Sequence, residues 1–244
     1  MRVARFYIDA PLASETQIRL PATVAHHAVR VLRLHDGDPI VLFNGRGGEF
    51  AASILIDGKQ VDARLAAFSA VERESELSIT LVQSWIASDK LDWLIEKSVE
   101  LGVHAIVLVP CQRSVIRLTG DRLARRIERL RDIIVAACAQ CGRNQIPPLE
   151  ASVSFRDALQ LRGEMPLGLL LEPQAGSAKI SNAQLINSTI KILVGPEGGF
   201  DPEELAHAKA VGYRPYQLGP RVLRTETAGL AALALLQSVA GDLA

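Results

Sequence analysis

The sequence predicts an α/β protein in which a small β-rich region precedes a larger domain built on a mostly parallel sheet. Two observations indicate this class. Residues 1–72 carry short alternating strands around a glycine-rich turn, whereas residues 73–244 alternate apolar runs of strand length with longer amphipathic segments. Between them lies the polar stretch SAVERESE (69–76), where we place the domain boundary.

The β-rich region has one clear hairpin signal, the turn FNGRGGEF, between the apolar runs DPIVLF and EFAASILI. Its predicted elements are strands at 2–8, 38–43, 49–56 and 60–68, with one short helix at 23–34.

The larger region begins with a strand and a helix. The run LSITLVQS (77–84) predicts the strand, and a helix at 88–102 follows, with Ser88 as its cap and Gly102 at its end. The run VHAIVLVP (103–110) is apolar on both faces, as in a parallel sheet. The next helix, 121–141, keeps one apolar stripe and places most of its arginines off that stripe.

The remainder of this region continues the alternation. Strands are predicted at 166–172, 190–195 and 213–219. The helix DPEELAHAKAVG has Asp201 as N-cap, Pro202 at its first position and Glu204 to close a capping box. The last helix, 225–241, is apolar nearly all round, so we expect it to be buried.

Composition narrows the class of protein. Of 244 residues, 48% are hydrophobic and 22% charged, and no apolar run is long enough to span a membrane. The first fifteen residues lack a long apolar stretch, so we expect no signal peptide. An odd count of three cysteines argues against a disulfide framework. These features favour a cytoplasmic protein.

Charge is neutral overall but uneven. There are 27 basic and 27 acidic residues, which alone is weak evidence against nucleic-acid binding. Residues 111–145, however, hold eight arginines and only three acids, a local charge of +5. That segment is a candidate RNA-facing surface.

Three other interpretations of the cysteines and glycines are disfavoured. Cys138 and Cys141 form a CxxC pair, but at a helix end, where the dipole favours the thiol over the thiolate. No Cys/His spacing matches a zinc site, so we predict no metal. Neither GxGxxG nor GxxxxGK[ST] occurs, which argues against a phosphate cradle.

Three predicted strands end in unusual loops, at 169–174, 193–200 and 218–228. Ligands of open α/β sheets bind at the carboxyl ends of strands, so these loops could build one pocket. Gly195, Gly198 and Gly199 would let backbone groups approach a ligand without intervening side chains, although tight turns alone would also explain them.

The motifs LVGPEGGF and LGPRVLRTETA resemble the signature of the bacterial small-subunit rRNA uridine-N3 methyltransferases of the SPOUT superfamily. The stretches HHAVRVLRLHDGD, EKSVELGV and CGRNQIP are also similar to that family, in the same order and over almost the whole chain.

The resemblance implies an N-terminal PUA-like β domain (1–72) that helps to bind RNA and a C-terminal SPOUT methyltransferase domain (73–244). It further implies a trefoil knot over about 168–240, a rare feature that periodicity could not predict. S-adenosylmethionine is the implied cofactor, N3 of a uridine in 16S rRNA of the small ribosomal subunit the methyl acceptor, and a homodimer the assembled form.

The family pattern also implies a cofactor site in which backbone amides and apolar side chains hold adenine. The implied cofactor neighbours are Leu171, Glu172, Leu193, Val194, Gly195, Pro196, Gly198, Gly199, Leu218, Gly219, Leu223, Thr225 and Thr227.

For catalysis, the resemblance directs attention to groups that would stabilise the anion left when uracil N3 loses its proton. Arg224 is the first candidate and Arg113 the second. Glu197 either holds the loop or faces the sulfonium or the substrate. Three routes for the loss of the N3 proton stay open: a water acts as the base, Glu197 acts as the base, or the enzyme uses the fraction of uridine that is already anionic. The implied RNA contacts are Arg30, Arg33, Arg122, Arg125, Arg126, Arg143 and Asn144.

Two alternatives remain at this point. A non-catalytic RNA-binding factor in ribosome assembly would use the arginines but not the glycine loops. A ribose 2′-O-methyltransferase shares the knot, although the N-terminal region and the LGPRVLRTETA motif favour the base-N3 family.

Overall fold

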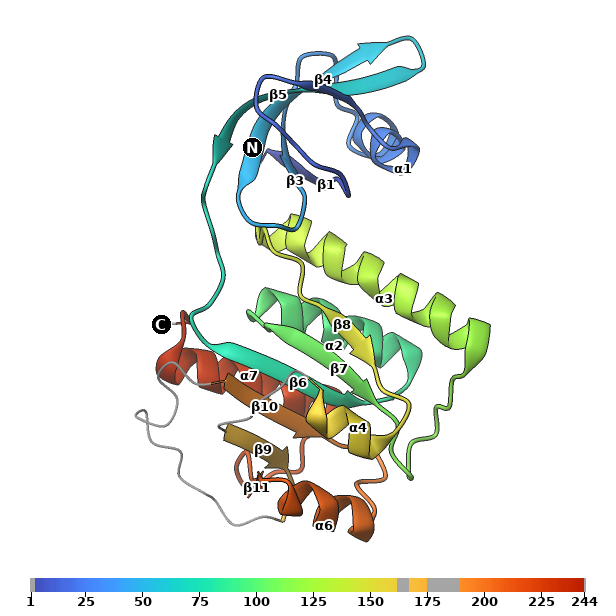
Figure 1. Cartoon of the computed structure of the whole chain (residues 1–244), viewed down its shortest axis with the longest axis vertical. Coiled ribbons are helices and arrows are strands. Elements are labelled where there is room, and N and C mark those ends of the chain that lie inside the picture. Colours follow the sequence, from blue (N-terminus) through green and yellow to red (C-terminus); the bar gives the residue numbers. More distant parts are fainter. Residues whose placement is uncertain (1–2, 162–166, 175–188, 244) are drawn as a thin grey trace. The chain divides into compact units, whose positions relative to one another are not determined.

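The computed structural model describes residues 3–161, 167–174 and 189–243. The chain forms two compact units, each with its own sheet (Figure 1). The first contains Met1–Glu74 and Cys138–Ile146, and the second contains Ser75–Ala137 and Pro147–Ala244. The first unit therefore also takes up a short segment from the middle of the sequence.

The first unit is a five-stranded sheet in the order β1-β3-β4-β5-β2. Only β1 and β3 pair in parallel; the other pairs are antiparallel. Alternate residues of the strands face one core that includes Phe6, Leu42 and Ile54. The strand bounds are β1 (Ala4–Tyr7), β2 (Gln17–Arg19), β3 (Pro39–Phe43), β4 (Glu49–Asp57) and β5 (Gln60–Ser69). The predicted hairpin at β3–β4 is confirmed.

The helix predicted at 23–34 is shorter and changes its geometry. It consists of α1 (Ala22–His26), continued by the π-helical turn η1 (His27–Val31). The amide of Leu32 donates to the carbonyl of His27 at 2.9 Å, five residues back, which widens the last turn. Arg33 then has a φ of +55°, so the chain leaves the helix before residue 34.

The segment after the long arginine-rich helix corrects one prediction. Arg143 and Asn144, expected to contact RNA, are 5% and 0% exposed. The guanidinium of Arg143 pairs with Glu74, and the amide of Asn144 donates to the carbonyl of Val71 at 2.7 Å while accepting from Arg5 at 2.6 Å. These side chains stabilise the first unit instead.

The second unit is a six-stranded, all-parallel sheet in the order β11-β9-β10-β6-β7-β8. Its central strands are buried along their length, which explains their unbroken apolar sequences. The strand bounds are β6 (Ser78–Ser84), β7 (Ala105–Val109), β8 (Leu149–Ala151), β9 (Leu167–Leu171), β10 (Thr189–Val194) and β11 (Tyr213–Tyr216). Residue 166, predicted to begin β9, lies outside the described residues.

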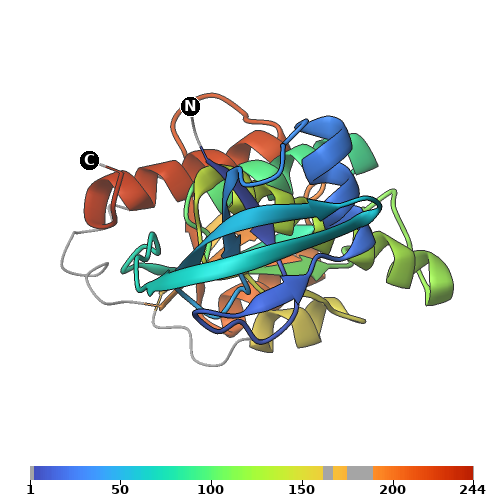
Figure 2. The same ribbon diagram turned by 90° about the horizontal axis from the view of Figure 1, so that it is seen from above.

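Helices cover both faces of this sheet. Figures 1 and 2 place α2 and α7 together on one face and α4 and α6 on the other, in agreement with their packing partners. The helix bounds are α2 (Ser88–Glu100), α3 (Gly120–Cys141), α4 (Phe155–Gln160), α6 (Pro202–Ala210) and α7 (Thr225–Ala240). The last residues of α3 belong to the first unit.

Two helix predictions need correction and one is confirmed. Ala87, not Ser88, is the N-cap of α2, and no side chain caps it. Helix α7 is buried on one face only, because Leu235 and Val239 are 40% and 38% exposed. The capping box of α6 is present as predicted. Among the helices described, none is long and apolar enough to cross a membrane.

Candidate functional site

A cavity of about 640 Å³ lies at the carboxyl ends of β9, β10 and β11. These strands are neighbours in the sheet, and the amide after β9, Glu172 N, donates to the carbonyl of Tyr216 at the end of β11 at 3.1 Å. The three loops singled out in the sequence therefore meet in one place. Their common position follows from the parallel direction of the strands.

The loop after β10 leaves its backbone uncovered. A Cβ on Gly195 would lie 2.9 Å from the ring of Phe200, so no side chain fits there without moving that ring. Gly199 has a φ of +70°, and its amide donates to the carbonyl of Pro196 at 2.9 Å to close a tight turn. The glycines thus serve both close packing and the turn.

A buried hydrogen-bond chain fixes this loop against the sheet. The amide of Gln83, which is fully buried, donates to the hydroxyl of Thr225 at 3.0 Å. That hydroxyl donates in turn to the carbonyl of Gly195 at 2.6 Å. Because Thr225 begins α7 and Gln83 lies in β6, two elements hold the carbonyl of Gly195 in place.

Apolar side chains line much of the cavity. They come from the ends of β9, β10 and β11 and from the loop before α7, and they can cover the faces of a flat ring. These residues are Leu171, Val194, Phe200, Tyr216, Leu218, Val222 and Leu223.

Charged groups gather at one side of the cavity. Nζ of Lys90 lies 3.5 Å from Oε1 of Glu197 and 3.9 Å from Oε1 of Glu226. The second carboxylate oxygen of Glu226 is buried and has no hydrogen-bond partner within the described residues. Arg224 precedes α7 with its side chain exposed, and no described group pairs with it. The cavity therefore presents two paired carboxylates, Glu197 and Glu172, and two exposed guanidinium groups without a described partner, those of Arg221 and Arg224.

Arg113 reaches the same cavity from the loop after β7. Its guanidinium donates to the carbonyl of Gly198 at 3.3 Å and lies 3.9 Å from a carboxylate oxygen of Asp201. The side chain is half exposed, so it can meet a ligand as well as the loop.

The cavity brings together most of the residues predicted for the site. All three catalytic candidates line it, and so do ten of the thirteen predicted cofactor neighbours, namely Leu171, Glu172, Val194, Gly195, Pro196, Gly199, Leu218, Gly219, Leu223 and Thr225. Leu193 is instead fully buried in the core, and Thr227 is exposed on the first turn of α7. Gly198 contributes its carbonyl to Arg113 and does not line the cavity.

Sequence reasoning missed Lys90, Tyr216 and Arg221 as lining residues. Tyr216 ends β11 but lies inside the strand predicted at 213–219, so the predicted strand end fell three residues too late to single it out. Lys90 lies in α2, far from the three loops in sequence, and only the packing of α2 beside α7 brings it here.

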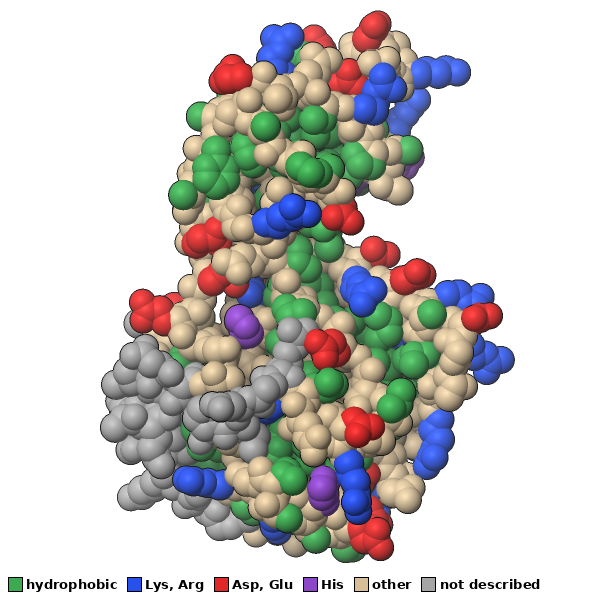
Figure 3. Space-filling view, in the orientation of Figure 1, with side chains coloured by type: hydrophobic (Ala, Val, Ile, Leu, Met, Phe, Trp, Pro, Cys, Tyr) green, Lys and Arg blue, Asp and Glu red, His purple; other side chains and the backbone are tan. Residues whose placement is uncertain are grey.

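The predicted RNA contacts separate into exposed and paired side chains. Arg30, Arg33, Arg122 and Arg125 are exposed, and basic side chains gather in Figure 3 over the region where α3 begins. Arg126 differs from this expectation, because its side chain is only 11% exposed. It pairs with Asp92 at 2.6 Å and donates to the carbonyl of Ser88 at 2.9 Å.

The cysteines lack the features of a redox site. Burial raises the pKa of the Cys138 thiol to about 12, and nearby Arg143 offsets this only in part. A thiol of that pKa is protonated at neutral pH and is a poor nucleophile. Over the parts of the chain that the structure describes, no three His, Cys, Asp or Glu residues come together as metal ligands would.

Comparison with known proteins gives a consistent result over the whole chain. Residues 73–237 match the family model described as an RNA methyltransferase domain, and residues 20–66 match the RNA methyltransferase PUA domain. Ribosomal RNA small subunit methyltransferase E of Rickettsia conorii is 32% identical over 96% of this chain and 95% of that protein.

Two solved structures with bound cofactor are similar over the full length of both chains. A methyltransferase of Legionella pneumophila in complex with S-adenosylmethionine is 35% identical, with a TM-score of 0.93 and 100% coverage of each chain. Ribosomal RNA small subunit methyltransferase E of Neisseria gonorrhoeae bound to S-adenosylmethionine is 34% identical, with a TM-score of 0.90 and the same coverage. The chain therefore belongs to the RNA methyltransferase family, with a PUA-like N-terminal domain and a SPOUT methyltransferase fold.

Proposed function

We propose that this protein transfers the methyl group of S-adenosylmethionine to N3 of a uridine in 16S rRNA of the small ribosomal subunit. The observation that carries the proposal is the cavity with an uncovered backbone loop at Gly195–Gly199, in a chain similar end to end to two structures that contain S-adenosylmethionine.

The cavity fits that cofactor in size and chemistry. A volume of about 640 Å³ lies within the range of small-molecule sites, which are largely apolar with a few fixed polar groups. Leu218 and Leu223 supply apolar faces for adenine, and the backbone at Gly195 and Gly219 supplies hydrogen-bonding groups.

The bound cofactor would supply an already activated methyl group, so the protein chiefly positions the partners. The acceptor nitrogen must lose its proton, and negative charge then spreads to the uracil oxygens. Arg224, and Arg113 as the second candidate, would stabilise that charge through the guanidinium. Glu197 is held by Lys90 at 3.5 Å, which favours a role in fixing the loop.

The two domains, 1–72 and 73–244, would share the RNA. The first would contribute Arg30 and Arg33, and the second Arg122 and Arg125, whose side chains are exposed. Phosphate contacts of this kind set affinity and orientation more than sequence choice. Affinity would thus come from local basic surfaces despite a net charge of zero.

We further propose that the protein acts as a homodimer in the cytoplasm. Support comes from three exposed apolar side chains on the packed helix pair α2–α7, Trp93, Leu235 and Val239. Exposed large apolar side chains are frequent at subunit interfaces. We also propose that residues from about 168 to 240 form a trefoil knot.

The test is a methylation assay with a chemical readout of position. Small subunits from cells lacking this enzyme would be incubated with the protein and S-adenosylmethionine, and the rRNA digested to nucleosides for mass spectrometry. We expect one new 3-methyluridine per subunit. A 2′-O-methylated nucleoside would instead support the ribose methyltransferase, and subunit binding without any methylation would support the assembly factor.

A further inference from the structure

A second cavity, of about 600 Å³, lies at the carboxyl ends of β7 and β8. It opens on the same edge of the parallel sheet as the proposed cofactor cavity, but between other loops. Its walls come from the loop after β7, the start of α3, the segment from β8 into α4, and the first turns of α6. The methyl-transfer chemistry proposed above uses none of this space.

The two cavities share a wall. Phe155 lines the second cavity and Phe200 the cofactor cavity, and their rings are in edge contact with centroids 5.9 Å apart. Nearby, Arg113 of the cofactor cavity lies 3.9 Å from Asp201 of the second. A substrate that places one group beside the cofactor can therefore reach the second cavity with a neighbouring group.

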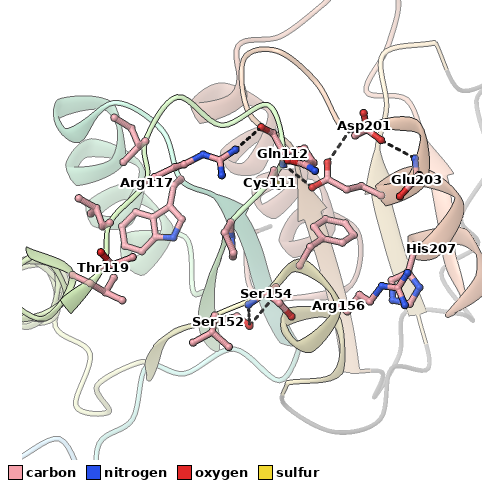
Figure 4. Close-up of a pocket in the computed structure, with 18 of the residues that line it drawn as sticks. Cys111, Gln112, Arg117, Thr119, Ser152, Ser154, Arg156, Asp201, Glu203 and His207 are labelled. Carbon is pink, nitrogen blue, oxygen red and sulfur yellow. Dashed lines mark hydrogen bonds between the residues drawn. The ribbon is translucent and has the colours of Figure 1, made fainter.

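The lining of the second cavity suits a nucleoside. Figure 4 shows Arg117 and Thr119 on one side and Arg156 and His207 on the other, with Ser152 and Ser154 between them. Arginine and hydroxyl groups bind phosphate and ribose oxygens. The buried Nε2 of His207 has no partner within the described residues and can bond a base or sugar.

Apolar contact is available as well. Trp85 is 4% exposed and forms part of the wall, and Phe155, which also lines the cavity, is half-buried. Bases bind to aromatic rings largely irrespective of sequence. Burial raises the pKa of the Cys111 thiol to about 12, so this wall residue is neutral at physiological pH and takes no part in chemistry.

The acidic side chains at the cavity are mostly occupied by the protein itself. Glu204 accepts from the backbone amides of Gln112 at 2.8 Å and Asp201 at 2.9 Å. Asp201 accepts from the amide of Glu203 at 3.0 Å and faces Arg113. By contrast, no described group pairs with the exposed Arg156. Its charge is therefore available to a phosphate.

We infer that the second cavity is an RNA subsite that holds a nucleoside next to the methylated one, with Arg156 and Arg117 on its phosphates. This inference rests on the proposed function and adds a specificity-determining site to it. By holding the neighbour of the target, the subsite would fix the target base beside the cofactor.

Two variants test the subsite by different physical means. Arg156→Glu reverses a charge that no described group pairs with, and Glu is favourable in the first turn of α4. Thr119→Trp fills the cavity without changing charge. The matched control is Arg214→Glu, an exposed position on β11 outside both cavities. Binding to unmethylated small subunits is measured by filter retention, and S-adenosylmethionine affinity by calorimetry.

We expect both variants to bind small subunits about tenfold more weakly, the size of one lost base contact, and Arg214→Glu to stay within about twofold. S-adenosylmethionine affinity should stay within about twofold for all three. Subunit affinity unchanged in both variants would overturn the subsite and leave the proposed function standing. A parent protein that binds S-adenosylmethionine but neither binds nor methylates subunits would overturn both.

Discussion

At the scale of single residues, the position of Gly195 shows how the site depends on the absence of a side chain. Its carbonyl is held by Thr225 at 2.6 Å, and the space where a Cβ would lie is taken by Phe200. The sequence predicted an uncovered loop here because three glycines follow an apolar strand. It could not predict that Gln83, over a hundred residues earlier, anchors the loop through Thr225.

The burial of long polar side chains could not be predicted from the sequence. Arg143 and Asn144 carry no sequence signal of burial, since their partners Glu74 and Arg5 are distant in the chain. Arg126 differs from its exposed neighbour Arg125 because Asp92 and the carbonyl of Ser88, both in α2, hold its guanidinium. A basic helix face can be predicted from sequence, but the ion pairs that occupy it cannot.

The roles of the two arginines can be separated kinetically. We expect Arg224→Gln to lower kcat by about a hundredfold, the usual effect of removing a group that stabilises developing negative charge. S-adenosylmethionine affinity should change little, since the guanidinium has no described partner in the loop. Single-turnover methylation of small subunits, measured over a pH series, gives the rate.

Part of the Arg224→Gln loss should be recovered at high pH, where more of the uridine is already anionic. The matched variant Arg113→Gln should have a smaller effect on kcat, because Arg113 is partly engaged with Gly198 and Asp201. An unchanged kcat in Arg224→Gln would remove this residue from the catalytic group.

At the scale of elements, the carboxyl ends of three strands position the cofactor cavity. Strands β9, β10 and β11 are adjacent and parallel, so their carboxyl ends and the loops that follow lie together. The sequence predicted this meeting from apolar runs and glycine loops alone. It did not predict the π-helical turn at His27–Val31, at the end of which the amide of Leu32 donates to a carbonyl five residues back.

The hydrogen bonds at the start of α6 should contribute to the free energy of unfolding. Glu204 is 8% exposed and accepts from two backbone amides, so Glu204→Ala leaves both without their partner. We expect the free energy of unfolding in urea to fall by about 2 kcal/mol. Glu203→Ala, at an exposed position in the same turn, should change it by less than about 0.5 kcal/mol. Equal effects of the two substitutions would contradict the role of the capping box.

The stability of the first unit should depend on pH through Glu49. Burial alone would raise the pKa of Glu49, but hydrogen bonds and charge from Arg5, with Asn144 and Arg73, hold it below its ordinary value of 4.5. A carboxylate with a lowered pKa stabilises the fold above the unfolded-state value, and that contribution is lost as the pH falls through the folded-state value.

We therefore expect Glu49→Gln to destabilise the protein at pH 7, with the difference from wild type shrinking as the pH falls below about 4.5. Urea unfolding followed by circular dichroism at several pH values measures this difference. A difference that did not vary with pH would mean that the ionised form of Glu49 contributes nothing.

At the scale of the whole molecule, we expect a dimer because α2 and α7 carry exposed apolar side chains. The double variant Leu235→Glu, Val239→Glu places two carboxylates on that face and should sediment as a monomer. The control Ala66→Glu, Ala67→Glu changes exposed residues of β5 and should sediment as wild type. Analytical ultracentrifugation reports the mass directly, and a wild-type protein that sediments as a monomer would contradict the proposal.

Whether the loop at Gly195–Gly199 binds S-adenosylmethionine is tested by calorimetric titration of the wild type beside Gly195→Arg. Ala67→Arg, an exposed position in the first unit, is the matched control. We expect binding to the wild type and the control and none to Gly195→Arg, because the new side chain would fill the cavity against Phe200. Equal binding to all three, with Gly195→Arg folded by circular dichroism, would contradict this expectation.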